Sequence, residues 1–300
     1  MSVPLHTIIR TLRRYHMKNL KRGLRVLATQ YTNVIILFCF SVLLLSCETV
    51  PITGRQRLSI IPEADLLTLS LQQYSQVLKE SKLSTDSGKV FRVRNVGNKI
   101  ARSAETFLRE SGRGASVKDY QWEFNVINDD KTVNAWCMPG GKVAVYTGIF
   151  PITRDETGMA VVLSHEIAHA IAGHGSERMS QSLVAQLGGV ALSTALKTHP
   201  GTTSALFMQA YGAGASLGFL LPYSRLQKSE ADRIGLMLMA RAGYNPERAV
   251  DLWVRMNEKE KGSRPPEFLS THPAPESRIA DIKTYIPEAM PYYQGYRQTK

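Results

Sequence analysis

Apolar residues recur at helical spacing in two long segments of the chain. Residues 63–82 and 89–110 place apolar side chains three and four positions apart, which predicts two amphipathic helices. The period then changes, because apolar and other residues alternate at 122–126 and 143–145, which predicts two short strands around a turn at 134–141. This pattern predicts a mainly α fold with a small β-sheet, an α+β domain.

A third helix is expected directly after the second strand, at residues 155–173, and its residues 159–171 are largely apolar. The strand before it could offer an exposed edge to an extended peptide, or the two strands could form a hairpin that only completes the core, and the sequence favours neither. Residues 177–221 then hold two stretches rich in Gly, Ala and Leu. Neither is a continuous apolar span of the about 20 residues that cross a membrane, so we expect buried or interfacial helices rather than a membrane-touching hairpin.

The first part of the chain has the plan of an export signal. Residues 1–33 carry seven Lys or Arg side chains and no acid, and an apolar run follows at residues 34–45. This run is shorter than the about 20 residues of a membrane-spanning helix. It ends in Leu-Leu-Ser-Cys at residues 44–47, which resembles the lipobox of bacterial lipoproteins, where cleavage precedes a cysteine that receives lipid. A signal anchor, or an ordinary signal with a chance cysteine, is the alternative, and Met17 is an alternative start.

These features predict the location and the domain boundaries. Cys47 would be the first residue of the mature chain and would anchor it to the membrane through lipid. Its neighbour is Glu48 rather than Asp, so the inner-membrane retention signal known for some lipoproteins is absent, which favours the outer membrane facing the periplasm. The expected parts are a lipoprotein signal peptide at 1–46, a tether at 47–62, one folded domain at 63–290 and a C-terminal tail at 291–300.

The formal net charge is much smaller once the predicted signal peptide is removed. Without its seven basic residues, the formal net charge falls from +12 for the full sequence to +5 for residues 47–300. The remaining positive charge is scattered and forms no long basic stripe with interleaved aromatics, which argues against nucleic-acid binding. Cys39 leaves with the signal and Cys47 is acylated, so Cys137 remains alone and no intrachain disulfide is expected.

The most specific chemical signal lies in the third predicted helix, which contains the pattern H-E-x-x-H. His165 and His169 are four residues apart, so both project from one helix face and their imidazoles can converge on one tetrahedral zinc ion. Glu166 is offset by one residue, which places its carboxylate beside the metal as a general base for the attacking water. The alternative is an amphipathic helix with two surface histidines, but helix packing alone gives no reason for this spacing.

Several short motifs along the chain are shared with a known family. On these motifs the chain resembles the HtpX-like and BepA-like zinc metallopeptidases, relatives of the CAAX prenyl proteases within the gluzincins. The resemblance covers most of residues 47–300 and implies a zincin-like peptidase domain, one zinc ion per chain and peptide hydrolysis with Glu166 as base. It also implies polypeptide substrates such as misfolded or stalled envelope proteins. The shared motifs are residues 50–54, 134–141, 165–169, 224–225, 230–235 and 270–273.

The chain departs from that family's pattern at the third zinc ligand. Zinc that keeps a water in its fourth position needs three protein ligands. The family reads Ser-Arg-x-x-Glu-x-Glu-Ala-Asp here and its first Glu is that ligand, but this chain has Lys228, whose ammonium repels a divalent cation. Asp232, which in the family supports a zinc histidine without touching the metal, is present. A Lys228–Asp232 salt bridge across one helical turn is the simplest account of this face.

Glu230 and His272 are the remaining candidates. Glu230 lies two residues from Lys228, about 200 degrees around the helix, so it cannot replace the lost ligand and is assigned a supporting or structural role. In BepA-like relatives, the His of the Ser-Thr-His-Pro motif can reach the zinc as a removable plug. His272 could instead complete a three-histidine site with His165 and His169, or it could be only a turn residue before a proline.

The other histidines have no comparable support. His174 follows His169 by five residues and is interpreted as a helix cap or a surface residue. The sequence thus supports two functions. The first is a zinc metalloendopeptidase of the cell envelope, and the second, because of Lys228, is a zinc-weakened pseudo-peptidase that acts as an envelope chaperone or assembly factor. The sequence does not identify any protein with which this chain would assemble. The remaining histidines are His6, His16 and His199.

Overall fold

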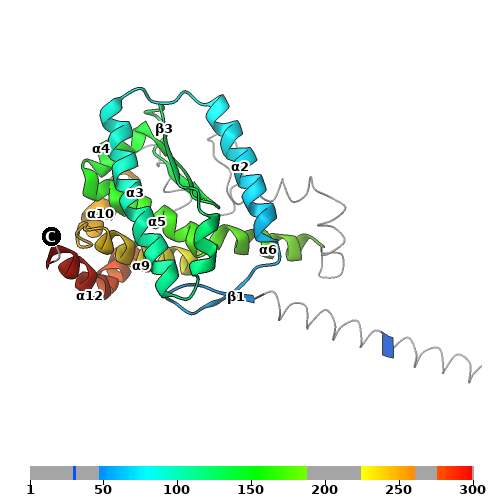
Figure 1. The fold of residues 1–300 in the computed structure, drawn as a ribbon. Helices are drawn as coiled ribbons and strands as arrows, with labels where there is room; N and C mark the ends of the chain where they lie inside the picture. The colour runs from blue at the N-terminus through cyan, green and yellow to red at the C-terminus, as the bar shows by residue number, and fades with distance from the viewer. Residues whose placement is uncertain (1–29, 32–46, 188–223, 261–275, 299–300) are drawn as a thin grey trace, which may run out of the picture. The chain divides into compact units, whose positions relative to one another are not determined.

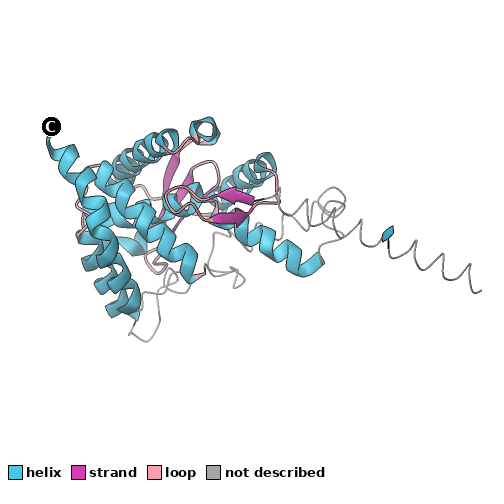
Figure 2. Cartoon of the chain, turned by 90° about the horizontal axis from the view of Figure 1, so that it is seen from below, coloured by secondary structure: helices cyan, strands magenta, loops and turns pink. Residues whose placement is uncertain are grey.

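The computed structural model describes residues 30–31, 47–187, 224–260 and 276–298 (Figure 1). Helices surround a few short strands, as Figure 2 also shows, which confirms the predicted mainly α fold with a small β-sheet. The helices are α2 (Glu63–Glu80), α3 (Ser87–Glu110), η1 (Gly114–Asp119), η2 (Thr147–Ile149), α4 (Phe150–Thr153), α5 (Glu156–Ile171), α6 (His174–Leu187), α9 (Arg225–Arg241), α10 (Arg248–Glu260) and α12 (Glu276–Gln298). The strands are β1 (Cys47–Thr49), β2 (Gln56–Leu58), β3 (Glu123–Ile127), β4 (Ala135–Met138) and β5 (Lys142–Tyr146).

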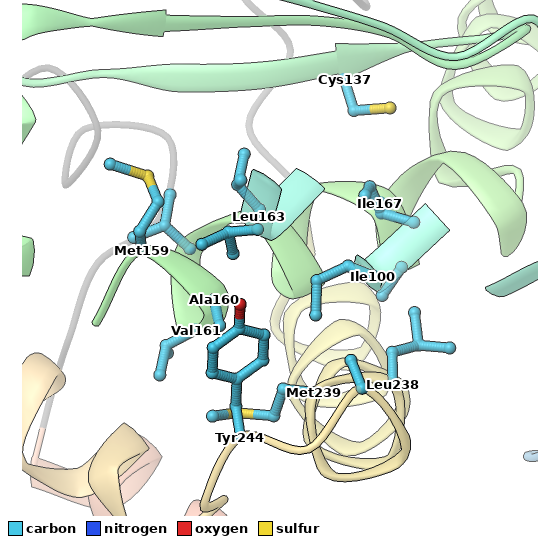
Figure 3. Close-up of a cluster of buried hydrophobic side chains, with 14 of the residues drawn as sticks. Ile100, Cys137, Met159, Ala160, Val161, Leu163, Ile167, Leu238, Met239 and Tyr244 are labelled. Atoms are coloured by element: carbon cyan, nitrogen blue, oxygen red, sulfur yellow. The ribbon is translucent and has the colours of Figure 1, made fainter. Parts of the chain in front are cut away.

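Helix α5 lies at the centre of the core and carries the H-E-x-x-H motif. Its first turn is capped by Asp155, whose side chain accepts a hydrogen bond of 2.8 Å from the backbone N–H of Gly158. The helix packs against α9, α3 and β4, and Figure 3 shows Leu163 and Ile167 of α5 between the sheet and α9. Because almost every residue of α5 is buried, its side chains are held in place from all directions.

The small sheet has a topology that the sequence did not predict. Strands β3 and β5 were expected around a turn, but they are parallel neighbours, and the residues expected as a turn contain β4, which pairs antiparallel with β5. Strand β5, which precedes α5, therefore lies between β3 and β4 in this sheet. Both expectations are wrong, because β3 and β5 do not form a hairpin and β5 is not an edge strand of this sheet. All four residues of β4 are buried. Such a strand has no apolar–polar alternation, and a search for that alternation misses it.

Helix α9 carries the second motif and packs directly on α5. It begins with a capping box, in which the Ser224 hydroxyl accepts from the N–H of Gln227 and the Gln227 side chain accepts from the N–H of Ser224. A Cβ atom at Gly235 would lie 3.2 Å from backbone atoms of Ser164 and His165. The absence of a side chain at Gly235 thus lets the two helices approach closely.

Residues 47–62 were expected to form an extended tether, but from residue 48 onward they belong to the folded domain. Strands β1 and β2 pair with each other, and Val50 and Ile61 are buried. The backbone N–H of Ile60 donates a 3.0 Å hydrogen bond to the Ser180 hydroxyl of α6. The Pro and Gly residues of this segment make tight turns against the core, and a composition typical of linkers concealed that packing.

The C-terminal boundary also differs from the expected one. Residues 291–300 were expected to be a tail, but α12 continues to Gln298, and its Tyr293 packs partly buried against the core. Helix α12 tolerates Pro287 and Pro291 within its length. A proline inside a helix usually kinks or ends it, so the sequence gives little sign that this helix continues past residue 290.

Several predicted features lie outside the described residues. They include the apolar run 34–45, the part of residues 177–221 that follows α6, and His272. The same holds for His6, His16 and His199. Within the described ranges, no helix combines the length and apolar character that crossing a membrane requires.

Candidate metal centre

Helix α5 brings His165 and His169 together as the sequence predicted. Their Nε2 atoms lie 3.1 Å apart, and both side chains are almost completely buried. Glu166 is buried as well, on the same helix. Burial raises the pKa of the Glu166 carboxyl well above its ordinary value, although the positive charges of Arg278 and Arg178 oppose this effect.

His165 is held by a buried ion pair. Its Nδ1 lies 2.9 Å from Oδ1 of Asp232, and the guanidinium of Arg278 contacts both oxygens of the same carboxylate at 2.8 Å. Burial would raise the pKa of Asp232, but Arg278 and His165 outweigh it, so the pKa falls below its ordinary value. Burial lowers the pKa of His165 to about 4, against the opposing effect of Asp232. The imidazole is therefore neutral near pH 7.

Arg278 and Trp253 complete this side of the site and were not predicted. The Arg278 guanidinium lies 3.4 Å from the centre of the Trp253 ring, and that ring meets His165 edge to face at 5.7 Å. Nη2 of Arg278 is 3.3 Å from Nε2 and 3.5 Å from Nδ1 of His165. Because these distances are nearly equal, Nη2 does not lie along the Nε2 lone pair, which would take it much farther from Nδ1.

His169 is held differently, through a second buried histidine. Its Nδ1 lies 2.7 Å from Nδ1 of His174, whose Nε2 lies 3.1 Å from Oε2 of Glu230. The interpretation of His174 as a cap or surface residue is wrong, because its side chain is fully buried. Gly173 adopts a φ of +66° between the two helices, and this turn brings His174 back to His169.

Glu230 is the centre of a buried polar cluster. It accepts hydrogen bonds from Arg55 Nε at 2.8 Å and from the Thr53 hydroxyl, while two further nitrogens of Arg55 bind Glu177 at 2.6 and 2.8 Å. Burial would raise the pKa of Glu230, but the hydrogen bonds from His174, Arg55 and Thr53 lower it to about 2. Glu230 is thus a carboxylate at neutral pH. The sequence signal for this cluster was Thr53 of the shared motif at residues 50–54, together with Arg55, which directly follows that motif.

Lys228 lies on the other face of α9 and is half-buried. Burial first, and then the charges of Arg278 and Arg225, lower its pKa to about 8. The expected Lys228–Asp232 salt bridge is absent from the described part of the chain, where Asp232 pairs with His165 and Arg278 instead. Arg278 competes better because its planar fork binds both carboxylate oxygens.

The two histidines fit a divalent metal. Nδ1 of each faces a partner, Asp232 for His165 and His174 for His169, which leaves the Nε2 atoms directed toward each other. A separation of 3.1 Å suits two nitrogens that share a metal at the about 2.0–2.1 Å typical of zinc. Within the described ranges, no group of three or more His, Cys, Asp or Glu side chains is placed to hold a metal ion. His272, the candidate third ligand, lies outside these ranges.

Comparisons with known proteins agree with this arrangement. Residues 97–286 match the model of Peptidase family M48. The chain is 32% identical over 257 residues to the mitochondrial metalloendopeptidase OMA1 of Saccharomyces cerevisiae, an alignment that covers 82% of this chain and 71% of that protein. It is 30% identical over 175 residues to the beta-barrel assembly-enhancing protease of Yersinia pestis, covering 57% of this chain and 36% of that protein.

A buried helix that carries H-E-x-x-H in a small α+β domain is typical of a metallopeptidase. The chain belongs to Peptidase family M48 and is a metalloprotease. The aligned regions leave much of several relatives uncovered, since the match to the OMA1 of Schizosaccharomyces pombe, at 38% identity, spans 53% of that protein. The location and substrates of this chain therefore need their own argument.

Proposed function

We propose that this chain is a zinc-dependent metalloendopeptidase of the bacterial cell envelope that hydrolyses misfolded or stalled envelope proteins. The observation that carries the proposal is the pair of imidazole Nε2 atoms 3.1 Å apart on the buried helix α5, beside Glu166. His165 and His169 would hold the zinc ion. His272 is the candidate third ligand, since Lys228 stands at the position that the family resemblance assigns to a glutamate.

Glu166 and Asp232 have separate roles in the proposed peptide hydrolysis. Zinc, when bound, polarises the scissile carbonyl and lowers the pKa of the attacking water. Glu166 accepts the proton of that water on its carboxylate and passes it to the leaving amine. Burial raises the pKa of the Glu166 carboxyl, which favours its uptake of that proton. Asp232 keeps His165 oriented throughout.

The test compares the wild-type chain with Glu166→Gln, which preserves the shape of the side chain. Both purified proteins receive one equivalent of zinc, and cleavage of a reduced, alkylated polypeptide is followed by mass spectrometry. We expect equal zinc content and a cleavage rate lower by about 10²- to 10⁴-fold in the variant, the usual contribution of a general base. Equal cleavage rates would sink the peptidase proposal.

The envelope location is the finer part of the proposal. It rests on the basic and apolar leader, on Cys47 in a lipobox-like context and on the names of the Yersinia and Vibrio relatives as beta-barrel assembly-enhancing proteases. We expect labelled palmitate to enter the wild-type chain but not Cys47→Ala, and the wild type to fractionate with outer membranes. Fractionation with inner membranes, or equal labelling of both proteins, contradicts this location.

Lys228 supports a second candidate, a zinc-weakened pseudo-peptidase that binds envelope clients as a chaperone or assembly factor. A stable folded protein with no zinc would favour this candidate, whereas about one tightly held zinc per chain favours catalysis. If Lys228 is the cause of weak binding, Lys228→Glu raises both zinc affinity and turnover, because it replaces a repelling charge by an attracting one. No change in either quantity contradicts that explanation.

The role of His272 is tested separately. If His272 is a removable plug, His272→Ala raises the cleavage rate and leaves the zinc content unchanged. If His272 is a ligand, the same substitution strips zinc and abolishes cleavage. A variant with unchanged rate and zinc content would leave His272 as only a turn residue.

A further inference from the structure

Arg55 connects the N-terminal segment to both helices that flank the metal-binding helix. Its guanidinium contacts Glu177 of α6 at 2.6 and 2.8 Å and Glu230 of α9 at 2.7 and 2.8 Å. The side chains of Glu177 and Glu230 are 6% and 4% exposed, so these ion pairs are little screened by water. Arg55 thus fixes the position of Glu230 relative to α6.

Glu230 passes this constraint on to His169. Its Oε2 lies 3.1 Å from Nε2 of His174, and Nδ1 of His174 lies 2.7 Å from Nδ1 of His169. Glu230, His174 and His169 are buried, and the Arg55 side chain is 20% exposed. The order of contacts is therefore Arg55, Glu230, His174 and His169, and each step is a hydrogen bond of ordinary length.

The series also determines which nitrogen of His169 carries a proton. The Glu230 carboxylate can only accept, so Nε2 of His174 is the donor in their hydrogen bond. A neutral imidazole has one N–H, and Nδ1 of His174 is then an acceptor. Nδ1 of His169 must donate to it, which leaves Nε2 of His169 as a lone pair that faces His165. A metal ligand needs this tautomer.

We infer that Arg55 is a positioning residue of the metal centre, which sets the orientation and tautomer of His169 through Glu230 and His174. This inference rests on the proposed function, in which His169 binds zinc. It means that the segment directly after the predicted lipid anchor contributes to the metal site as well as to attachment. Arg55 acts through other side chains and touches neither His165 nor His169.

The same segment supplies a matched control. Arg57 is buried, whereas Arg55 is partly exposed. Arg57 donates to the backbone oxygen of Gly173 at 3.2 Å and pairs with Glu48. It contacts neither Glu230 nor a histidine. Loss of Arg57 loosens the packing of the N-terminal segment, as loss of Arg55 does, without breaking the series that ends at His169.

The first measurement needs neither metal nor activity. Imidazole ¹⁵N shifts of the metal-free full chain report the tautomer of each histidine, and His169→Asn identifies the His169 signals. We expect the Nδ1–H tautomer of His169 in the wild type and in Arg57→Gln, and a mixture of tautomers in Arg55→Gln. The inference is overturned if Arg55→Gln keeps the wild-type tautomer, or if Arg57→Gln disturbs it equally.

The second measurement is zinc affinity by competition with a chelator, together with the visible spectrum of the Co²⁺-substituted protein. We expect Arg55→Gln to weaken zinc about 10- to 100-fold, the usual effect of losing a partner of a metal-binding histidine, and to change the Co²⁺ spectrum. Arg55→Lys should recover part of the affinity, because its ammonium still reaches one carboxylate. Equal losses in Arg55→Gln and Arg57→Gln contradict the inference.

These outcomes are distinct from failure of the proposed function. If the wild type binds zinc but does not hydrolyse peptides, the peptidase proposal fails while the tautomer and the zinc affinity still decide the role of Arg55. If the wild type binds no zinc, the tautomer measurement on the metal-free chain decides it alone.

Discussion

The two histidines of the motif have the same chemistry and the same helix, yet different parts of the chain hold them. His165 contacts Asp232 directly, and Arg278 locks that carboxylate from α12. His169 contacts His174, and the constraint continues through Glu230 to the N-terminal segment. The first arrangement is a single ion pair at one contact, whereas the second is a series in which each member depends on the next.

The charge balance of the two arrangements also differs. On the side of His165, one carboxylate, Asp232, faces one guanidinium, Arg278. On the side of His169, two carboxylates, Glu177 and Glu230, share Arg55. Removing Asp232 takes from Arg278 the carboxylate that binds it through both oxygens, whereas Arg55 keeps Glu177 when Glu230 is removed. The difference predicts unequal tolerance to substitution.

The largest expected effect is that of Asp232→Asn. We expect the free energy of unfolding to fall by roughly 3–5 kcal/mol, because the buried Arg278 loses the charge of the carboxylate that binds it at 2.8 Å through both oxygens. Urea unfolding of the metal-free protein, followed by circular dichroism, measures this loss. The double variant with Arg278→Met should recover part of the loss, and a single variant within about 1 kcal/mol of wild type would contradict the argument.

A smaller effect is expected for Glu230→Gln in the same assay. Arg55 keeps Glu177 as a counter-ion, so the variant loses charge-assisted hydrogen bonds of about 1.5–3 kcal/mol but strands no cation. If Glu230→Gln costs as much as Asp232→Asn, the two sides are alike and the comparison fails.

The pH dependence of the free energy of unfolding gives a further test of the side that contains Glu230. The pKa of Glu230 is about 2 in the folded protein against an ordinary value of 4.5, so its contribution is complete above pH 4.5 and is lost as the pH falls toward 2. We expect Glu230→Gln to show a shallower decline of stability over this interval than the wild type. Parallel curves would mean that Glu230 does not titrate as the hydrogen bonds require.

The smallest effect is expected at an exposed ion pair on the same helix. Arg233 of α9 pairs with Glu288 of α12 at 2.7 Å, and both side chains are more than a third exposed. We expect Arg233→Ala to change the free energy of unfolding by about 0–1 kcal/mol, since water screens such pairs. A larger loss would show that the packing of α9 on α12 depends on this exposed ion pair. It would then contradict the expected difference from the buried pair of Asp232.

The parts of the fold that the sequence predicted have strong local signals. Helices α2, α3 and α5 follow the apolar period to within two residues at each end. The convergence of His165 and His169 follows from the geometry of one helix. The position of Asp232 beside His165 agrees with the role that the family resemblance implies for it.

The parts that the sequence did not predict depend on contacts between distant residues. His174 was interpreted as a helix cap or a surface residue five positions past His169, but the turn at Gly173 places its side chain in the core against His169. Arg55 was assigned to a tether because proline and glycine surround it. Strand β4 was taken for a turn because burial on both faces removes the alternation that marks a strand.

The sequence distances within the site have a consequence for how the protein acquires its activity. Arg55 and Glu230 are 175 positions apart, and Arg278 reaches back 113 positions to His165. Contacts of such separation form late in folding, because the loops that they close are long. A partly folded chain thus contains the motif helix without the groups that orient its histidines. The groups that orient the two histidines are therefore complete only once α12 has docked, and we expect full activity to appear only in the completely folded chain.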